Sequence, residues 1–190
     1  MKLDAIPPGK NPPKDVNVLI EITGGANGGA PVKYELDKDS GAVFVDRIVN
    51  TPMFYPCNYG FVPNSLHDDG DPTDVLVLCD FALLPGVVIR CRPVGVLKME
   101  DDGGVDDKLV AVPIEKVDPF QAKIQDLADV PEKTRDRIKH FFEHYKDLEP
   151  GKWVKVVGWG DRAEAEAILT RSIEAAVESA TRGAARETDL

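Results

Sequence analysis

The sequence predicts one α+β domain that is mainly β, with strands filling the first two-thirds of the chain and two helices packed outside them. Seven short runs rich in Val, Ile and aromatic residues carry the strand signal, six before residue 115 and one near Trp159. Clusters of Gly, Pro, Asn and Asp separate these runs, which is typical of turns. Strands that follow one another without intervening helices favour an antiparallel barrel or sandwich.

The first three expected strands surround a glycine-rich loop. They cover Val16–Ile22, Val32–Asp37 and Ala42–Val49, and Asp39-Ser40-Gly41 fits the hairpin turn between the last two. The loop Thr23–Pro31 holds four glycines. It does not match a phosphate-binding loop, because no Gly-Lys-Ser/Thr follows it and no helix begins there.

The remaining expected strands are Val75–Cys79, Val87–Met99, Lys108–Ile114 and Trp153–Trp159, with a turn at Leu84-Pro85-Gly86. Strand periodicity also groups charged side chains. In the second strand of the chain, side chains two residues apart share a face, so a cation and a carboxylate project together. The two side chains are Lys33 and Glu35, and Arg47 ends a similar alternation in the third strand. Each of the three is either an ordinary surface charge or part of a site.

Two helices are expected after the strands. The first runs from about Pro131 to Leu148, and Pro150-Gly151 follows its end. Its apolar side chains recur at helical spacing: Ile138, Phe141, Phe142, Tyr145 and Leu148. The second helix begins after Asp161, which can cap it with help from Glu164. Its apolar stripe contains Ile168, Leu169, Ile173, Ala176 and Val177.

Length and composition fit one domain spanning residues 1–190. The chain has 190 residues and 43% hydrophobic content, enough for a core without disulfides. We expect residues 1–15 to form an N-terminal extension and residues from about 181 to 190 to form a flexible tail. The three cysteines lie in or beside apolar runs and predict buried reduced thiols: Cys57, Cys79 and Cys91. The absence of a targeting signal and of a run of transmembrane length predicts a soluble cytoplasmic protein.

The charge balance restricts the class of partner. Asp and Glu number 33 against 23 Lys and Arg, giving a net charge of -10. Nucleic-acid binding is not expected, because that function needs a basic face. An anionic small substrate would also be repelled unless bound metals or a focused group of cations reversed the local field.

Two acidic turns are either solvated surface loops or metal-binding sites, and the presence of two of them, each beside an apolar strand, favours metal binding. The segment His67–Asp74 contains four aspartates around a Gly and a Pro that exclude a helix. A second acidic group lies about thirty residues on, broken by Gly103 and Gly104, and contains Asp101, Asp102, Asp106 and Asp107. Clustered carboxylates are best tolerated when cations neutralise them, and all-oxygen ligands suit Mg²⁺, Mn²⁺ or Ca²⁺. A calcium-hand loop is excluded, because its required Gly and Glu positions hold Asp74 and Asp80.

A zinc peptidase is the main alternative. The predicted first helix contains His140-Phe141-Phe142-Glu143-His144, which matches the H-x-x-E-H pattern of inverted zinc peptidases. The two imidazoles share a helix face, and Glu164 or Glu166 could complete a zinc site. This hypothesis leaves both acidic turns without a role.

The segment Asp69-Gly70-Asp71-Pro72-Thr73-Asp74 resembles the D-[GN]-D-P-x-D signature of soluble family I inorganic pyrophosphatases. The resemblance extends from about Val16 to Ala176 and is to the prokaryotic branch of the family. It rests on further segments in the family's order and spacing: Lys33-Tyr34-Glu35, Asp46-Arg47, Met53 to Gly60, Arg90 to Gly95 and His144-Tyr145-Lys146.

This resemblance implies an OB-like, five-stranded closed barrel with additional strands and two main peripheral α-helices. It implies hydrolysis of inorganic pyrophosphate to two phosphates by a water that several Mg²⁺ ions activate, with Mn²⁺ or Zn²⁺ as substitutes and Ca²⁺ as an inhibitor. It also implies a homo-oligomer, a hexamer in related bacterial enzymes, with His140 and His144 at subunit contacts. An OB-like barrel could alternatively be a binding module without catalysis, but the acidic composition argues against an oligonucleotide partner.

By the same resemblance, Asp71 is the general base. The implied metal ligands are Asp69, Asp74, Asp101, Asp106, Glu35 and Glu21. The implied phosphate-binding groups are Lys33, Arg47, Tyr55, Lys108, Tyr145 and Lys146, with Glu35 among the residues that surround the substrate. Tyr59 and Asp102 are expected just behind these groups. Asp102 is a departure, because many members carry Glu there, and this puts in doubt only the contact that the longer side chain would make.

Overall fold

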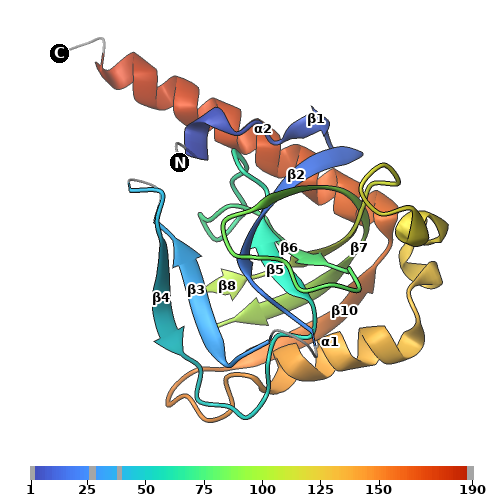
Figure 1. Cartoon of the computed structure of the whole chain (residues 1–190). Helices are drawn as coiled ribbons and strands as arrows, with labels where there is room; N and C mark the ends of the chain where they lie inside the picture. The colour runs from blue at the N-terminus through green and yellow to red at the C-terminus, as the bar shows by residue number, and fades with distance from the viewer. Residues whose placement is uncertain (1–2, 26–28, 38–39, 188–190) are drawn as a thin grey trace.

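The computed structural model describes residues 3–25, 29–37 and 40–187 and has the predicted mainly β, α+β architecture. Figure 1 shows a strongly curved sheet with one helix along each of two sides and a separate hairpin beside it. The strands are β1 Gly9–Asn11, β2 Asp15–Ile22, β3 Val32–Leu36, β4 Val43–Ile48, β5 Asn58–Phe61, β6 Asp74–Val77, β7 Val88–Asp101, β8 Gly104–Val105, β9 Lys108–Pro113 and β10 Val154–Gly160. The helices are α1 Glu132–His144 and α2 Arg162–Glu187, with short 3-10 helices η1 Leu3–Ala5, η2 Pro119–Lys123 and η3 Leu127–Asp129.

The main sheet closes into a ring. Its strands follow the order β2, β5, β6, β9 and β7, and β7 pairs with β2 again. This confirms the expected five-stranded, OB-like barrel. The pairings are antiparallel except that of β6 with β9, which is parallel. The prediction of a purely antiparallel sheet is therefore wrong for that pair. The long strand β7 lies between β6 and β9 in the chain, and β9 runs antiparallel to β7 and so in the same direction as β6.

Strand β5 was missed from the sequence. It is four residues long, and Gly60 lowers its strand propensity. The glycine is needed because a Cβ at this position would lie 1.9 Å from the backbone oxygen of Leu19 on β2. Close packing of β5 against β2 thus requires glycine at position 60, and glycine is a residue that weakens the strand pattern in the sequence.

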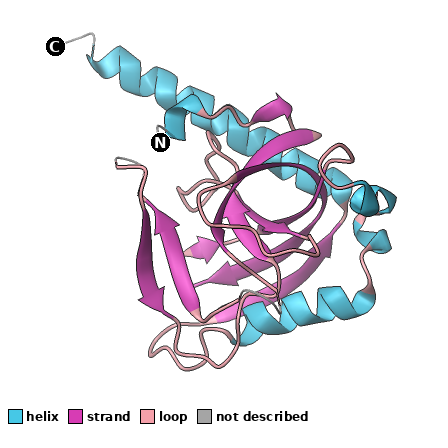
Figure 2. Cartoon of the chain, viewed as in Figure 1, coloured by secondary structure: helices cyan, strands magenta, loops and turns pink. Residues whose placement is uncertain are grey.

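Other strands extend the barrel or stand apart from it. β1 pairs with β2, so the expected N-terminal extension contributes a strand to the sheet. β8 and β10 both pair with β7. β3 and β4 form a separate two-stranded sheet, which Figures 1 and 2 show standing beside the barrel. Ala26, Asn27 and Gly28 of the glycine-rich loop and Asp39 of the predicted hairpin turn lie outside the described residues.

Each helix covers one side of the barrel, as predicted. In α1, Ile138, Phe141 and Phe142 are buried in the core. The helix ends at His144, and Leu148 is 59% exposed beyond it, so its assignment to the apolar stripe is wrong. Tyr145, the remaining member of that stripe, is buried.

Helix α2 begins with the predicted reciprocal cap. The Asp161 carboxylate accepts from the N–H of Glu164 at 2.9 Å, and the Glu164 carboxylate accepts from the N–H of Asp161 at 3.2 Å. Ile168 and Leu169 are buried, but Val177 is 62% exposed because the helix there projects past the barrel (Figure 1). The tail predicted from residue 181 is helical as far as Glu187, consistent with its Ala, Arg and Glu content, and residues 188–190 lie outside the described part.

The cysteines largely match the prediction. Cys57 and Cys91 are buried and Cys79 is half-buried, and all three are free thiols. Burial raises the pKa of the Cys57 thiol to about 12, so it stays protonated near neutral pH. Among the described residues, no helix combines the length and the apolar character needed to cross a membrane.

Candidate active site

One cavity of about 340 Å³ collects almost all the predicted site residues. It opens where the β3–β4 hairpin faces the barrel and the end of α1. Asp102 is not among its lining residues. Fourteen predicted residues line it: Glu21, Lys33, Glu35, Arg47, Tyr55, Tyr59, Asp69, Asp71, Asp74, Asp101, Asp106, Lys108, Tyr145 and Lys146. Sequence reasoning did not assign six further lining residues to the site: Tyr34, Leu36, Phe61, Pro72, Gly103 and Phe142.

The first acidic turn presents its carboxylates to solvent from a closed loop. The backbone N–H of Gly70 donates to the carbonyl of His67 at 3.0 Å, and Gly70 adopts the left-handed φ of 91° that glycine tolerates. The Asp69 carboxylate accepts from the N–H of Asp71 at 2.9 Å. Asp69 and Asp71 are exposed, whereas Asp74 is half-buried at the start of β6. Asp71 is therefore accessible to a water molecule in the cavity.

Lys108 occupies the centre of the acidic group. Its ammonium donates to both Asp74 and Asp106, and its side chain is 4% exposed. Burial alone would lower the pKa of Lys108, but the charges of the two aspartates outweigh burial and raise it. Burial also raises the pKa of Asp106, with Lys108 opposing that shift. The positive charge of Lys108 therefore allows the carboxylates of Asp74 and Asp106 to lie close together.

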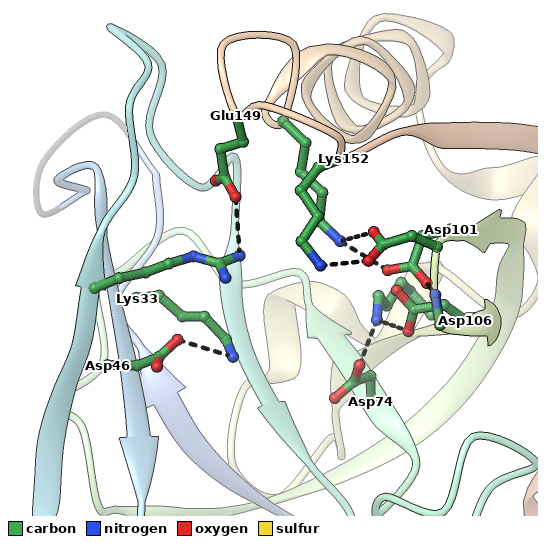
Figure 3. A network of polar contacts seen from close by, with 12 residues as sticks. Lys33, Asp46, Asp74, Asp101, Asp106, Glu149 and Lys152 are labelled. Carbon is green, nitrogen blue, oxygen red and sulfur yellow. Dashed lines mark hydrogen bonds and ion pairs between the residues drawn. The ribbon is translucent and has the colours of Figure 1, made fainter.

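The second acidic turn is held by lysines from beyond α1. Lys146 donates to Asp101 at 2.7 Å, and Gly103 N–H donates to the same carboxylate at 2.7 Å. Burial opposes the charge of Asp101, but these hydrogen bonds outweigh burial and lower its pKa. Asp102 pairs with Lys152, and its Oδ1 also lies 3.8 Å from Lys146 Nζ. Figure 3 shows Asp101, Asp106 and Asp74 grouped on one side of the site, and Lys33 with Asp46 on the other.

The β3–β4 hairpin supplies two cations to the other wall. Lys33 Nζ lies 3.2 Å from Asp46 Oδ2, and the two side chains remain 33% and 31% exposed. Arg47 Nη2 lies 3.8 Å from Glu149 Oε2. Glu149 was not predicted as part of the site, because it lies in the turn after α1 and matches no motif. Both cations are thus paired with carboxylates at partly exposed positions.

Glu21 differs electrostatically from the aspartates. It lies at the end of β2, is 9% exposed, and accepts from the N–H of Leu36 at 2.9 Å. Burial is the main cause that raises its pKa to about 7. Its carboxylate is consequently far easier to protonate than an exposed glutamate.

Three tyrosine rings form the apolar floor of the cavity. The centroids of Tyr55 and Tyr59 are 5.4 Å apart, and Tyr55 and Tyr145 both pack on Phe141, with centroids at 4.8 and 5.3 Å. Burial raises the pKa of all three phenols, so each keeps its proton and can act as a hydrogen-bond donor. The Lys108 ammonium lies 5.8 Å from the Tyr59 ring centroid.

The donor set fits hard divalent cations. Within the described residues, no three His, Cys, Asp or Glu side chains are close enough to share one ion. Lys108 explains this spacing, because it lies between Asp74 and Asp106. Mg²⁺ does not need three protein ligands, since it usually keeps several waters and binds through one or two carboxylates. Asp69, Asp74, Asp101 and Asp106 supply such oxygens around one cavity.

The zinc-peptidase pattern does not form a comparable site. His140 and His144 lie on the exposed face of α1, with ring centroids 4.7 Å apart, and neither lines the cavity. His144 Nδ1 lies 2.8 Å from Asp147 Oδ2, and Glu143 pairs with Lys139 at 3.6 Å. No third ligand joins the two histidines within the described residues.

Comparison with known proteins agrees with this geometry. The family model described as inorganic pyrophosphatase matches residues 18–177. The chain belongs to the inorganic pyrophosphatase family. A curated inorganic pyrophosphatase from Xanthomonas axonopodis pv. citri is 59% identical over 92% of this chain and 96% of the relative. This membership makes the chain a hydrolase of phosphoanhydride bonds, and neither the peptidase nor the binding-module alternative is supported.

Solved structures of related pyrophosphatases share the fold. The inorganic phosphatase of Anaplasma phagocytophilum has a solved structure with a TM-score of 0.87 at 49% identity, covering 90% of this chain and 98% of its own. The Thermus thermophilus inorganic pyrophosphatase has a TM-score of 0.86 at 45% identity, covering 93% and 99%. Enzymes of this family generally use divalent metal ions, in line with the carboxylates of the cavity.

Proposed function

We propose that the chain hydrolyses inorganic pyrophosphate to two phosphates in this cavity, with Asp71 as the general base. The observation that supports the proposal is the lining of the cavity, in which an exposed Asp71 lies with other carboxylates and with the cations of the β3–β4 hairpin. Pyrophosphate hydrolysis needs charge neutralisation and in-line positioning more than covalent catalysis. The cations and carboxylates around this cavity can supply the charge neutralisation.

The roles follow from where each side chain lies. Lys33, Arg47 and Lys146 bind phosphate oxygens in place of their present carboxylate partners, and they stabilise the charge that develops on the leaving phosphate. Tyr55 and Tyr145 remain protonated and donate hydrogen bonds, and the aromatic floor excludes water beneath the substrate. Asp71 accepts a proton from the attacking water.

Divalent ions are held by the carboxylates of Asp69, Asp74, Asp101 and Asp106, with Glu21 and Glu35 as further oxygen donors. When bound, the ions neutralise phosphate charge and lower the pKa of a coordinated water. Mg²⁺ is the proposed physiological ion, with Mn²⁺ or Zn²⁺ as substitutes. Asp74 and Asp106, which pair with Lys108, would also hold the ions. With these carboxylates neutralised by metal, the Lys108 ammonium would be free to contact phosphate.

Removal of divalent ions tests the proposal. Phosphate release from pyrophosphate should require Mg²⁺, stop when a chelator is added, and return when excess Mg²⁺ is supplied. Ca²⁺ should inhibit, because its longer and looser coordination fills the carboxylates without positioning water correctly. Phosphate release that continues in chelated protein would contradict the proposed site. Peptide hydrolysis restored by zinc, with pyrophosphate left intact, would favour the His140–His144 alternative instead.

We also infer that the chain forms a homohexamer. Both faces of β4 expose apolar side chains, since the neighbouring Phe44 and Val45 are 56% and 58% exposed and Ile48 is 67% exposed. Apolar patches on soluble proteins commonly mark interfaces. Sedimentation at neutral pH and micromolar concentration should give the mass of six chains, whereas a monomer under these conditions would exclude the assembly.

Two coarser proposals accompany this function. Residues 1–190 act as one catalytic domain, because α1 packs with barrel strands in one apolar cluster and α2 packs with barrel strands in a second. The cytoplasm is the proposed location, since three unpaired cysteines fit a reducing compartment.

A further inference from the structure

One buried serine fixes the acidic loop from behind. Ser65 lies between β5 and the loop and is 6% exposed. Its hydroxyl oxygen accepts from the backbone N–H of Thr73 at 2.9 Å, and the hydroxyl donates to the carbonyl of Val62 at 2.7 Å. The Ser65 hydroxyl therefore joins the two ends of segment 62–73 across the base of the loop.

Thr73 is the residue through which this contact reaches the carboxylates. It follows Pro72, which has no amide hydrogen, so the N–H of Thr73 is the first backbone donor after Asp71. Thr73 is fully buried, and its carbonyl accepts from the N–H of Val62 at 3.0 Å. Both backbone polar groups of Thr73 are therefore held. Asp71 lies two residues before this fixed point and Asp74 directly after it.

Ser65 is itself anchored from outside the loop. The N–H of the next residue, Leu66, donates to the carbonyl of Ser172 in α2 at 2.9 Å. The preceding residue, Asn64, has a left-handed φ of 54°, and its side-chain amide donates to the carbonyl of Ile6 at 2.8 Å. The segment that carries Ser65 is thus tied to α2 and to the N-terminal segment, so it provides a rigid reference for the loop.

The outer part of the loop depends on its own hydrogen bonds. The N–H of His67 donates to the carbonyl of Asp71 at 2.7 Å, and the Asp69 carboxylate accepts from the N–H of Asp71. These contacts keep the shape of the turn but do not set its position relative to β6. That position is set where the loop meets the barrel, through Val62, Ser65 and Thr73.

We propose that Ser65 is a positioning residue for divalent-metal binding, because its hydroxyl fixes the acidic loop so that Asp69 and Asp71 face the same ions as Asp74. The proposal rests on the proposed function, in which Asp69 and Asp74 bind the ions and Asp71 accepts the proton of the attacking water. Ser65 is not among the residues that line the active-site cavity. Groups that orient metal ligands commonly change metal affinity by about 10–100-fold when removed.

The test compares two buried serines. Ser65→Ala removes the contact to Thr73. Ser172 is 4% exposed, and Ser172→Ala removes a hydroxyl that donates to the Ile168 carbonyl within α2 at 3.0 Å. The affinity for Mn²⁺ is measured by electron paramagnetic resonance without substrate. It should fall by about 10–100-fold in Ser65→Ala and stay near the wild-type value in Ser172→Ala. The Mg²⁺ concentration for half-maximal phosphate release should rise in parallel, and saturating Mg²⁺ should restore most of kcat.

Thermal unfolding in chelator measures any general loss of stability in both variants. If Ser65→Ala does not fold, Ser65→Cys replaces it, because the thiol has similar size but is a poor hydrogen-bonding group. Wild-type Mn²⁺ affinity in the Ser65 variant, whatever its stability, would overturn the proposal. Wild-type protein that binds Mn²⁺ but releases no phosphate from pyrophosphate would instead overturn the proposed function and leave the role of Ser65 intact.

Discussion

We expect the Asp71→Asn variant to lose about 10²–10⁴-fold in kcat, the usual contribution of a positioned general base. Asparagine keeps the size and most of the hydrogen-bonding shape of aspartate but cannot accept the proton of the attacking water. The Asp71 N–H contact to Asp69 is a backbone contact and survives the change. Metal affinity should therefore change little, and a higher pH should restore part of the rate, because hydroxide becomes more abundant.

Asp74→Asn is the matched control for this prediction. It also replaces one carboxylate of the same motif with an amide, but Asp74 is proposed to hold metal rather than to accept the proton. Its variant should require more Mg²⁺ for half-maximal activity, and excess Mg²⁺ should recover part of the rate. Steady-state kinetics across a Mg²⁺ titration separate the two cases. Near-normal turnover in Asp71→Asn, or its rescue by Mg²⁺ alone, would move the role of base to another residue.

Much of the fold follows from local patterns. The alternation of apolar residues located all seven predicted strands and both main helices, because side-chain periodicity reflects which face is buried. Ring closure depends on β2 pairing with both β5 and β7, and no local pattern records such a long-range pairing. The parallel β6–β9 pair and the short strand containing Gly60 were missed for the same reason, since tertiary packing decides them.

The site was predictable where motifs carry chemistry and not where geometry alone does. The acidic segment around Asp71 and the resemblance of the flanking segments identified residues that the structure places in one cavity. Nothing in the sequence indicates that Glu149 would pair with Arg47 or that Ser65 would hold Thr73. Such partners are chosen by the folded chain, and neither their residue type nor their spacing is distinctive.

The position of Lys108 between Asp74 and Asp106 predicts a large effect on the free energy of unfolding of the metal-free protein. Replacing Lys108 with methionine keeps an unbranched side chain that is one atom shorter, but leaves two carboxylates at a poorly solvated site without their shared cation. Removal of one partner from a buried ion pair commonly costs about 3–5 kcal/mol. We therefore expect the metal-free Lys108→Met protein to lose about that much of its free energy of unfolding.

The surface lysine Lys98 is the control, because it pairs with Glu164 at 3.1 Å where the two side chains are 36% and 50% exposed. Lys98→Met should cost no more than about 1 kcal/mol. Denaturant unfolding in chelator measures both variants, and two further arms identify the cause. Adding Asp74→Asn to Lys108→Met should recover part of the lost stability by removing one of the repelling charges, and Mg²⁺ should stabilise Lys108→Met more than wild type by supplying the missing positive charge. Equal losses in the Lys98 and Lys108 variants, with no extra gain from Mg²⁺, would show that Lys108 does not hold the acidic group together in the absence of metal.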